Sequence, residues 1–214
     1  MLTSKKNSDT VEVSVASERA EAIGGVLIAF FAALMAIAQM VNGELEEEMM
    51  IAHNKVVNYS SWYQSKSIKE SLKESELNYL SALLESGIVL EENKAVIGNK
   101  IQTVKQQIEK YTSEKTEILI GSIQVGKANW AQDLDGEMGK ITGVKEWEAL
   151  TEEYDVATKK FDLAMLFFQI SIVLGAVCII IYDNPRLQKT FIILMILSGI
   201  IGVVMSLYGY SFAP

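Results

Sequence analysis

The sequence predicts an all-α integral membrane protein with three transmembrane helices and a long helical hairpin or bundle between the first and second spans. Two observations carry this prediction: three long, uncharged apolar runs, and a charged segment without proline between the first two runs. A helix needs about 20 apolar residues to cross a hydrocarbon core of roughly 30 Å. The uncharged runs lie within residues 23–41, 161–182 and 191–210, so each is long enough to form one span.

The three spans define the remaining segments of the chain. These segments are a polar N-terminal tail (1–22), an extramembrane helical domain (42–160), a turn (183–190) and a short C-terminus (211–214). The first apolar run is longer than the apolar region of a cleavable signal peptide, and no small-residue cleavage site follows closely. It therefore predicts a retained signal anchor.

The distribution of basic residues near the spans predicts the orientation. Five Lys or Arg lie on the side of the tail and the turn, and three lie on the opposite side: Lys5, Lys6, Arg19, Arg186 and Lys189 against Lys55, Lys159 and Lys160. The positive-inside rule then predicts a cytoplasmic tail and turn. On this prediction, residues 42–160 lie on the non-cytoplasmic side.

The extramembrane segment has the composition of long helices, because it is rich in Glu, Lys, Gln, Leu and Ala and has no Pro. We expect one arm from Glu44 to Glu85 and a second that begins near Asn93 or Asn99. A glycine-rich break is expected at 133–143, with helix resuming near Val144. An extended coiled coil and a compact bundle with a bent return arm are equally compatible with this pattern.

Apolar residues of both arms recur at steps of three, four and seven, which are the spacings of a helix-packing seam. The seam residues expected on the outgoing arm are Ile68, Leu72, Tyr79 and Leu83. Those expected on the returning arm are Ile101, Val104, Ile108 and Tyr111.

Composition argues against several functional classes. One His and one Cys cannot build a His/Cys zinc site within one chain, and a net charge of −8 argues against nucleic-acid binding. Asp133-x-Asp135-Gly136 resembles the opening of a calcium loop, but Met138 and Val144 stand where that loop needs Gly and Glu. We therefore expect no catalytic, cofactor-binding or metal site. The acidic cluster Glu44, Glu46, Glu47 and Glu48 is interpreted as a solvated collar.

Two groups of residues are candidates for interactions. Small residues at four-residue spacing let helices approach closely in lipid, either within one chain or between copies. These possible packing residues are Gly25, Ala29, Ala33, Ser171, Gly175, Ser198, Gly202 and Ser206. Polar and aromatic residues near the membrane end of the outgoing arm form a possible interaction platform: Tyr59, Trp62, Tyr63, Gln64 and Lys66. Packing between helices is the simpler interpretation of the second group.

Two polar side chains stand inside the apolar runs. Gln39 lies in the first run and Gln169 in the second, and each needs a hydrogen-bonding partner in lipid. None of the three runs contains a charged residue, which argues against a proton relay or an ion pathway through the spans.

Two stretches carry a family resemblance. Tyr63-Gln64-Ser65-Lys66-Ser67-Ile68-Lys69, together with Asp162-Leu163-Ala164 and the run Phe168 to Leu174, resembles the motifs of domain-of-unknown-function family 4337. Ser65 departs from the usual Ala, and Lys69 stands where Arg is common. The resemblance covers about residues 18 to 210 and implies a three-span protein of the bacterial inner membrane. It supplies no catalytic residues.

These features favour a membrane-anchored helical scaffold or accessory protein that self-associates and presents its helical domain to a partner. The expected partners are membrane lipid and either further copies or other subunits of a membrane complex. Two alternatives remain open. One is a sensor or ligand-binding module with a separate output subunit, and the other is a transport or channel subunit.

Overall fold

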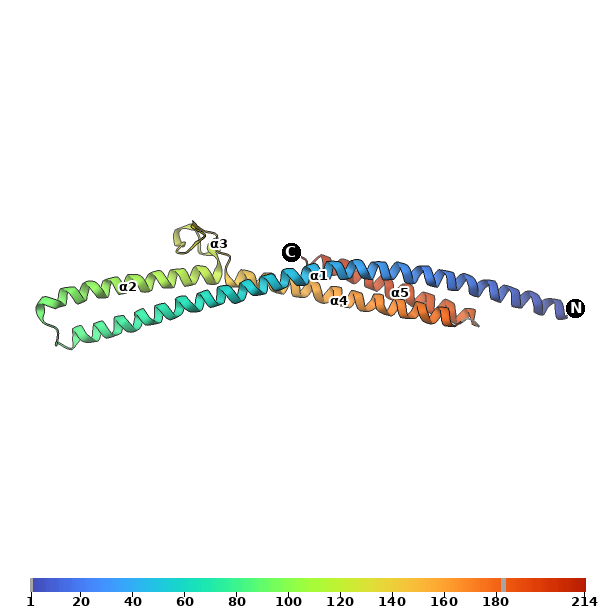
Figure 1. Cartoon of the computed structure of the whole chain (residues 1–214), viewed down its shortest axis with the longest axis horizontal. Coiled ribbons are helices and arrows are strands. Elements are labelled where there is room, and N and C mark those ends of the chain that lie inside the picture. Colours follow the sequence, from blue (N-terminus) through green and yellow to red (C-terminus); the bar gives the residue numbers. More distant parts are fainter. Residues whose placement is uncertain (1, 182–183) are drawn as a thin grey trace. The chain divides into compact units, whose positions relative to one another are not determined.

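The computed structural model describes the backbone of residues 2–181 and 184–214 and the side chains of residues 18–181 and 184–214 (Figure 1). Lys5 and Lys6, which were counted to predict the orientation, lie outside the described side chains. The same is true of Asp183, the first residue of the predicted turn. The elements are α1 (Leu2–Glu85), α2 (Glu91–Ile120), α3 (Ser122–Val125), the 3₁₀ helix η1 (Lys127–Asn129), β1 (Asp133–Leu134), β2 (Glu137–Met138), α4 (Val144–Ile180) and α5 (Pro185–Tyr210).

The predicted all-α class is confirmed, since helices make up most of the described chain. Three helices, α1, α4 and α5, are long and apolar enough to cross a membrane, as predicted. The sequence analysis did not predict β1 and β2, which form one short antiparallel pair with Asp133 opposite Met138 and Leu134 opposite Glu137. α4 begins at Val144, where the sequence predicted that helix resumes.

The chain divides into two compact units. The span unit consists of Met1–Met49 and Glu152–Pro214, and it contains the first part of α1, most of α4 and all of α5. The arm unit is Met50–Thr151, which contains the second part of α1, α2 and the short elements that follow it.

The core of the span unit is apolar and includes close aromatic packing. Its buried residues come from all three helices: Phe31, Ala38, Phe161, Ala164, Phe168 and Met195. The rings of Phe31 and Phe168 stack with their centroids 6.4 Å apart. α1 contributes buried or partly buried residues at steps of four and three: Ala20, Gly24, Leu27, Phe31, Leu34, Ala38, Val41 and Leu45.

Glycines on α4 and α5 allow the three helices to approach closely. A Cβ atom added at Gly199 would lie 2.0 Å from Cε1 of Phe31, and one at Gly175 would lie 2.5 Å from Cγ1 of Ile28. Neither position has room for a larger side chain. Both glycines thus act as small residues do at helix interfaces in lipid, where they let the helices approach closely. The Ser198 hydroxyl donates a hydrogen bond of 2.9 Å to the Phe167 carbonyl and so links α5 to α4.

α5 begins earlier than the predicted third span. Asn184 caps the helix, because its side chain accepts a hydrogen bond of 3.2 Å from the Leu187 amide. Pro185 occupies the first helical turn, where its missing N–H costs nothing. Residues 185–190, which the sequence analysis assigned to a turn, are therefore helical.

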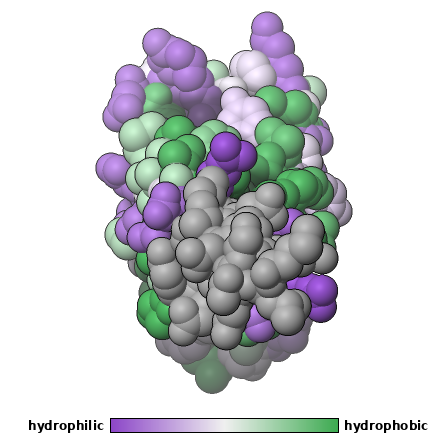
Figure 2. Space-filling view, turned by 90° about the vertical axis from the view of Figure 1, so that its right-hand side faces the viewer, coloured by the Kyte–Doolittle hydropathy of each residue, from purple (hydrophilic) through white to green (hydrophobic). Residues whose placement is uncertain are grey.

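Much of the surface of the span unit is apolar. Val26, Met40, Val173, Ile180 and Leu207 each expose more than 60% of their surface. Figure 2 shows apolar residues at the surface beside hydrophilic ones. A helix that is apolar on all sides is typical of a protein core or a membrane span.

In the arm unit, α2 lies beside the second part of α1 in antiparallel orientation (Figure 1). The residues of α2 expected to pack are buried at Val104 and partly buried at Ile101, Ile108 and Tyr111. On α1 the expectation is wrong: Ile68, Leu72 and Tyr79 are 62%, 64% and 68% exposed, and only Leu83 is partly buried. The residues of α1 turned inward are instead Tyr59, Tyr63, Lys66, Glu70, Lys73, Leu77, Leu80 and Leu84.

We expect Gly199→Ala to destabilise the span unit by about 1–3 kcal/mol, because the added methyl group overlaps the Phe31 ring. The matched control is Gly25→Ala, since nothing lies within 4 Å of its added Cβ. That control should be neutral or slightly stabilising, because Ala favours helix more than Gly does. Thermal unfolding of the detergent-solubilised protein would measure both, and equal midpoints for the two variants would contradict this packing.

Candidate interaction site in the helical arm

The part of the interface between α1 and α2 that lies near the end of α2 is charged rather than apolar. Lys66 Nζ of α1 lies 2.6 Å from Glu114 Oε2 of α2, and Lys115 of α2 forms an ion pair with Glu70 of α1. Each helix thus contributes one lysine and one glutamate. Glu114 and Glu70 are only 4% and 8% exposed, so both carboxylates are removed from bulk water. We call these four residues the polar seam.

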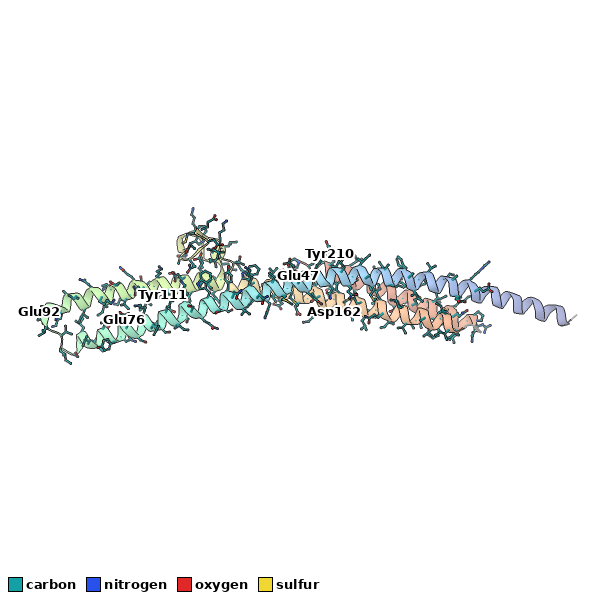
Figure 3. The ribbon with its side chains drawn as sticks, in the orientation of Figure 1. Glu47, Glu76, Glu92, Tyr111, Asp162 and Tyr210 are labelled. Carbon is teal, nitrogen blue, oxygen red and sulfur yellow. The ribbon has the colours of Figure 1, made fainter. Side chains whose placement is uncertain are left out.

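Each lysine of the polar seam also lies near an aromatic ring of the opposite helix. Lys66 Nζ lies 6.0 Å from the centroid of the Tyr111 ring, and Lys115 Nζ lies 5.7 Å from that of Tyr63. These distances are within or near the range of cation–π attraction. Every lysine of the seam therefore contacts a carboxylate and a tyrosine that both belong to the partner helix. Figure 3 labels Tyr111 on α2 and Glu76 farther along α1.

The environment of the seam shifts the pKa of two of its members. Burial raises the pKa of Glu70, but hydrogen bonds from Lys115 and Thr112 and the charge of Lys115 outweigh it, so the pKa falls below its ordinary value. The hydrogen bond to Glu70 raises the pKa of Lys115 against the opposing effect of burial. The contribution of Glu70 to stability is present above its unfolded pKa of about 4.3 and is lost as the pH falls through its lower folded pKa.

The polar seam fixes how α1 is rotated against α2. Burying two ion pairs costs desolvation energy, so such pairs contribute less to stability than apolar packing of the same volume. Removing one member is more costly, because its partner is left as an unpaired buried charge. A rotation of α1 about its axis would separate both lysines from both carboxylates, so the pairing selects one arrangement of the two helices.

The five residues of the predicted platform do not form one exposed surface. Tyr63 and Lys66 take part in the contacts with α2. Tyr59 and Trp62 pack edge to face with ring centroids 5.7 Å apart, while Gln64 is exposed. Burial, followed by the charge of Asp135, raises the pKa of the Tyr59 hydroxyl. The aromatic part of the predicted platform thus packs within the arm unit.

Some of the small residues predicted to pack are buried in the structure, and others are exposed. Ser171, Gly175, Ser198 and Gly202 are buried within the span unit, and Ser171 Oγ donates a hydrogen bond of 3.0 Å to the Met195 carbonyl. Ser206 is partly buried, and its hydroxyl has no partner in the part of the chain that the structure describes. In α1, Gly25 is partly buried, and Ala29 and Ala33 are exposed.

Gln39 and Gln169, the two glutamines within the predicted apolar runs, are exposed on the span unit. Asn42, at the end of the first apolar run, is buried and reaches two acids through its Nδ2. It donates hydrogen bonds of 3.0 Å to Glu46 and 3.1 Å to Asp162. The sequence analysis did not single out Asn42, although a polar residue that follows an apolar run at the spacing of the buried residues is a recognisable signal.

A buried carboxylate organises the segment after α2. Glu117 is fully buried, and its Oε2 accepts hydrogen bonds of 2.8 Å from the amides of Ala131 and Gln132. Its Oε1 accepts a third bond, of 2.7 Å, from the Ser122 hydroxyl. The same hydroxyl accepts from the Ile141 amide at 2.9 Å. Glu117 therefore holds the backbone that precedes the glycine-rich break, and through Ser122 it is linked to Ile141 within the break.

Asp135 and Gly136, which resemble part of a calcium-loop opening but were not predicted to bind metal, lie in a tight turn. Asp135 and Gly136 have φ values of 52° and 83°, as the two central residues of a type I′ hairpin turn require. Within residues 18–181 and 184–214, no three His, Cys, Asp or Glu side chains are grouped as metal ligands. The acidic residues Glu44, Glu46, Glu47 and Glu48 are exposed, as is His53.

An apolar cavity of about 490 Å³ lies where α1 connects to α2. Six of its seven lining residues are apolar and one is an amide: Leu83, Ile88, Val89, Leu90, Val96, Ile97 and Asn93. The lining residues include no ionisable side chain, so the cavity offers contacts rather than acid–base chemistry.

We expect Glu70→Gln to lower the free energy of unfolding of the arm by about 1–3 kcal/mol, because Lys115 loses its charged partner. The matched control is Glu109→Gln, an exposed residue of α2, which should change stability by less than about 0.5 kcal/mol. Chemical denaturation at pH 7 and pH 3 would measure both variants. The difference in free energy of unfolding between Glu70→Gln and the natural chain should be smaller at pH 3 than at pH 7. An equal difference at the two pH values would contradict the role of the Glu70 charge.

We expect Glu117→Ala to loosen residues 121–143 without unfolding α1, because the amides of Ala131 and Gln132 lose their common acceptor. Hydrogen exchange measured by mass spectrometry should show faster exchange in this segment. Exchange in α1 should be unchanged. Unchanged exchange at Ala131 and Gln132 would show that other contacts hold the segment.

The comparisons with known proteins assign the chain to a family without a described activity. No curated protein and no solved structure is significantly similar to it. One family model, described as "Domain of unknown function (DUF4337)", matches residues 20–212, which is 193 of the 214 residues. This match includes both units and all three apolar helices. The chain therefore belongs to the DUF4337 family, as its motifs indicated.

Proposed function

We propose that this protein is a membrane-anchored helical scaffold that self-associates and presents its helical arm to a partner without catalysing a reaction. The observation that carries the proposal is the apolar surface of the arm. Ile68, Leu72 and Tyr79 of α1, and Ile88 and Leu90 of the link to α2, are each more than 60% exposed in a unit that is otherwise rich in charge. Exposed apolar groups of this kind are characteristic of interaction surfaces.

The anchor in this proposal consists of the three apolar helices inserted in a bacterial inner membrane, with lipid around their apolar surfaces. Residues 42–160 extend from the membrane as a helical hairpin on the non-cytoplasmic side, in accord with the excess of Lys and Arg in the tail and turn. The two arms of the hairpin form a short antiparallel coiled coil, which the polar seam keeps aligned.

The polar seam suits a scaffold because it makes the arm a rigid support. The ion pairs fix the rotation of α1, so the outward side of the helix always presents the same residues. A surface offered in one orientation binds a partner with a smaller loss of conformational entropy. The polar seam thus supports the proposal that the outward side of α1 is presented to a partner in one fixed orientation.

Cross-linking in intact membranes followed by native mass spectrometry tests this function. We expect oligomers of the chain, alone or with a copurifying protein, and recovery in the membrane fraction until detergent is added. Protease treatment of spheroplasts should cut within residues 42–160 and leave the turn after α4 intact. A strict monomer without a copurifying protein, or a chain that is soluble without detergent, would refute the proposal.

A further inference from the structure

The outward side of α1 in the arm unit carries a row of exposed apolar residues. Met50, Val57, Ile68, Leu72 and Tyr79 are 65%, 52%, 62%, 64% and 68% exposed. At about 100° per residue, these five positions fall within a sector of about 60° on one side of the helix. We call these five residues the arm face.

The arm face is free of charge although the helix is not. The same rotation per residue places the Lys and Glu residues of α1 between Met50 and Glu85 outside the sector of the arm face. The shorter polar residues within the sector include Ser61 and Ser75, which are both exposed. Small side chains between large apolar ones leave room for the ridges of another helix.

α2 cannot cover this face, because it packs on the opposite side of α1. Lys66 and Glu70, which pair with α2, lie about 150–170° around the helix from Ile68. The steps along the arm face are seven, eleven, four and seven residues, which correspond to about 3.5–3.7 residues per turn. This period keeps the face in contact with one neighbouring helix along its length.

We propose that the arm face binds the arm face of a second copy, with the two arms parallel. This inference rests on the proposed function, since two chains anchored in one membrane extend their arms in the same direction. Charge favours a second copy. The exposed Lys69 lies to one side of the face and the exposed Glu74 to the other. A parallel twofold pair sets the lysine side of each copy against the glutamate side of the other, twice by symmetry.

The area of the face agrees with a stable dimer. The five side chains each expose more than half of their surface. Together they offer on the order of 600 Å² per copy, so two copies bury at most about 1,200 Å² through these five residues, which is the lower limit for specific interfaces. Contacts of the intervening serines add to this area.

Single cysteines at the face test the pairing in native membranes. In a chain whose natural cysteine is replaced by Cys178→Ala, Ser61→Cys and Ser75→Cys should each form a disulfide with the same residue of a second copy under mild oxidation. Ser113→Cys is the matched control, because it is exposed on the side of α2 turned away from α1. Efficient cross-linking at both face positions and at least fivefold less at Ser113 supports the proposal. Equal yields at all three positions would overturn it.

A charge substitution provides the second test on the full chain in detergent. The double variant Leu72→Lys and Tyr79→Lys should shift the native mass spectrum at least tenfold towards monomer, because like charges meet across the twofold axis. Its circular dichroism should stay unchanged, since both side chains are exposed. Ile123→Lys, at a position that is 85% exposed elsewhere in the arm unit, should leave the dimer intact.

The outcomes separate this inference from the proposed function. An oligomer that resists the double variant and forms no disulfide through residues 61 and 75 refutes the arm face alone and leaves self-association standing. A natural chain that is monomeric in both experiments refutes the second copy and the self-association together. Cross-linking of the face cysteines to a different protein refutes the second copy as occupant.

Discussion

The pairing of Lys66 with Glu114 and of Lys115 with Glu70 determines how the helical arm is arranged. A charge that leaves water needs its partner at hydrogen-bonding distance, whereas an apolar side chain tolerates many neighbours. The two ion pairs therefore specify one rotation of α1 against α2. The same rotation turns Ile68 and the rest of the arm face outward, so the apolar surface of the arm is a consequence of its charged interior.

The sequence predicted the helices of the arm but not the inward side of its outgoing helix. Apolar spacing predicted the packed side of α2 because Ile101, Val104 and Ile108 lie on that side. On α1 the same reasoning selected Ile68 and Leu72, which are exposed, because it assumes that a packed side is apolar. Lys66 and Glu70 of α1 have partners more than 40 positions away, and a single sequence does not show such pairings.

Some of the local polar features could be predicted from the sequence, and others could not. The Asp135-Gly136 pair is a known signal for a two-residue hairpin, and the positive φ values of both residues agree with it. Glu117 carries no comparable signal, because its acceptor role depends on amides 14 and 15 residues farther along the chain. In the first apolar helix, small residues occur on several sides, so their spacing did not distinguish the buried positions Gly24 and Ala38 from the exposed Ala29 and Ala33.

The link between α1 and α2 differs physically from the segment after α2. Gly87 has a φ of 72° with nothing within 4 Å of an added Cβ, and the neighbouring Ile88 is 79% exposed. At Gly143 an added Cβ would instead meet the backbone of Gly121 at 2.3 Å. An epitope or a fluorescent reporter inserted at Gly87 would therefore extend into open solvent. The same insertion at Gly143 would force two backbones apart, which makes the first loop the position for labelling the arm in living cells.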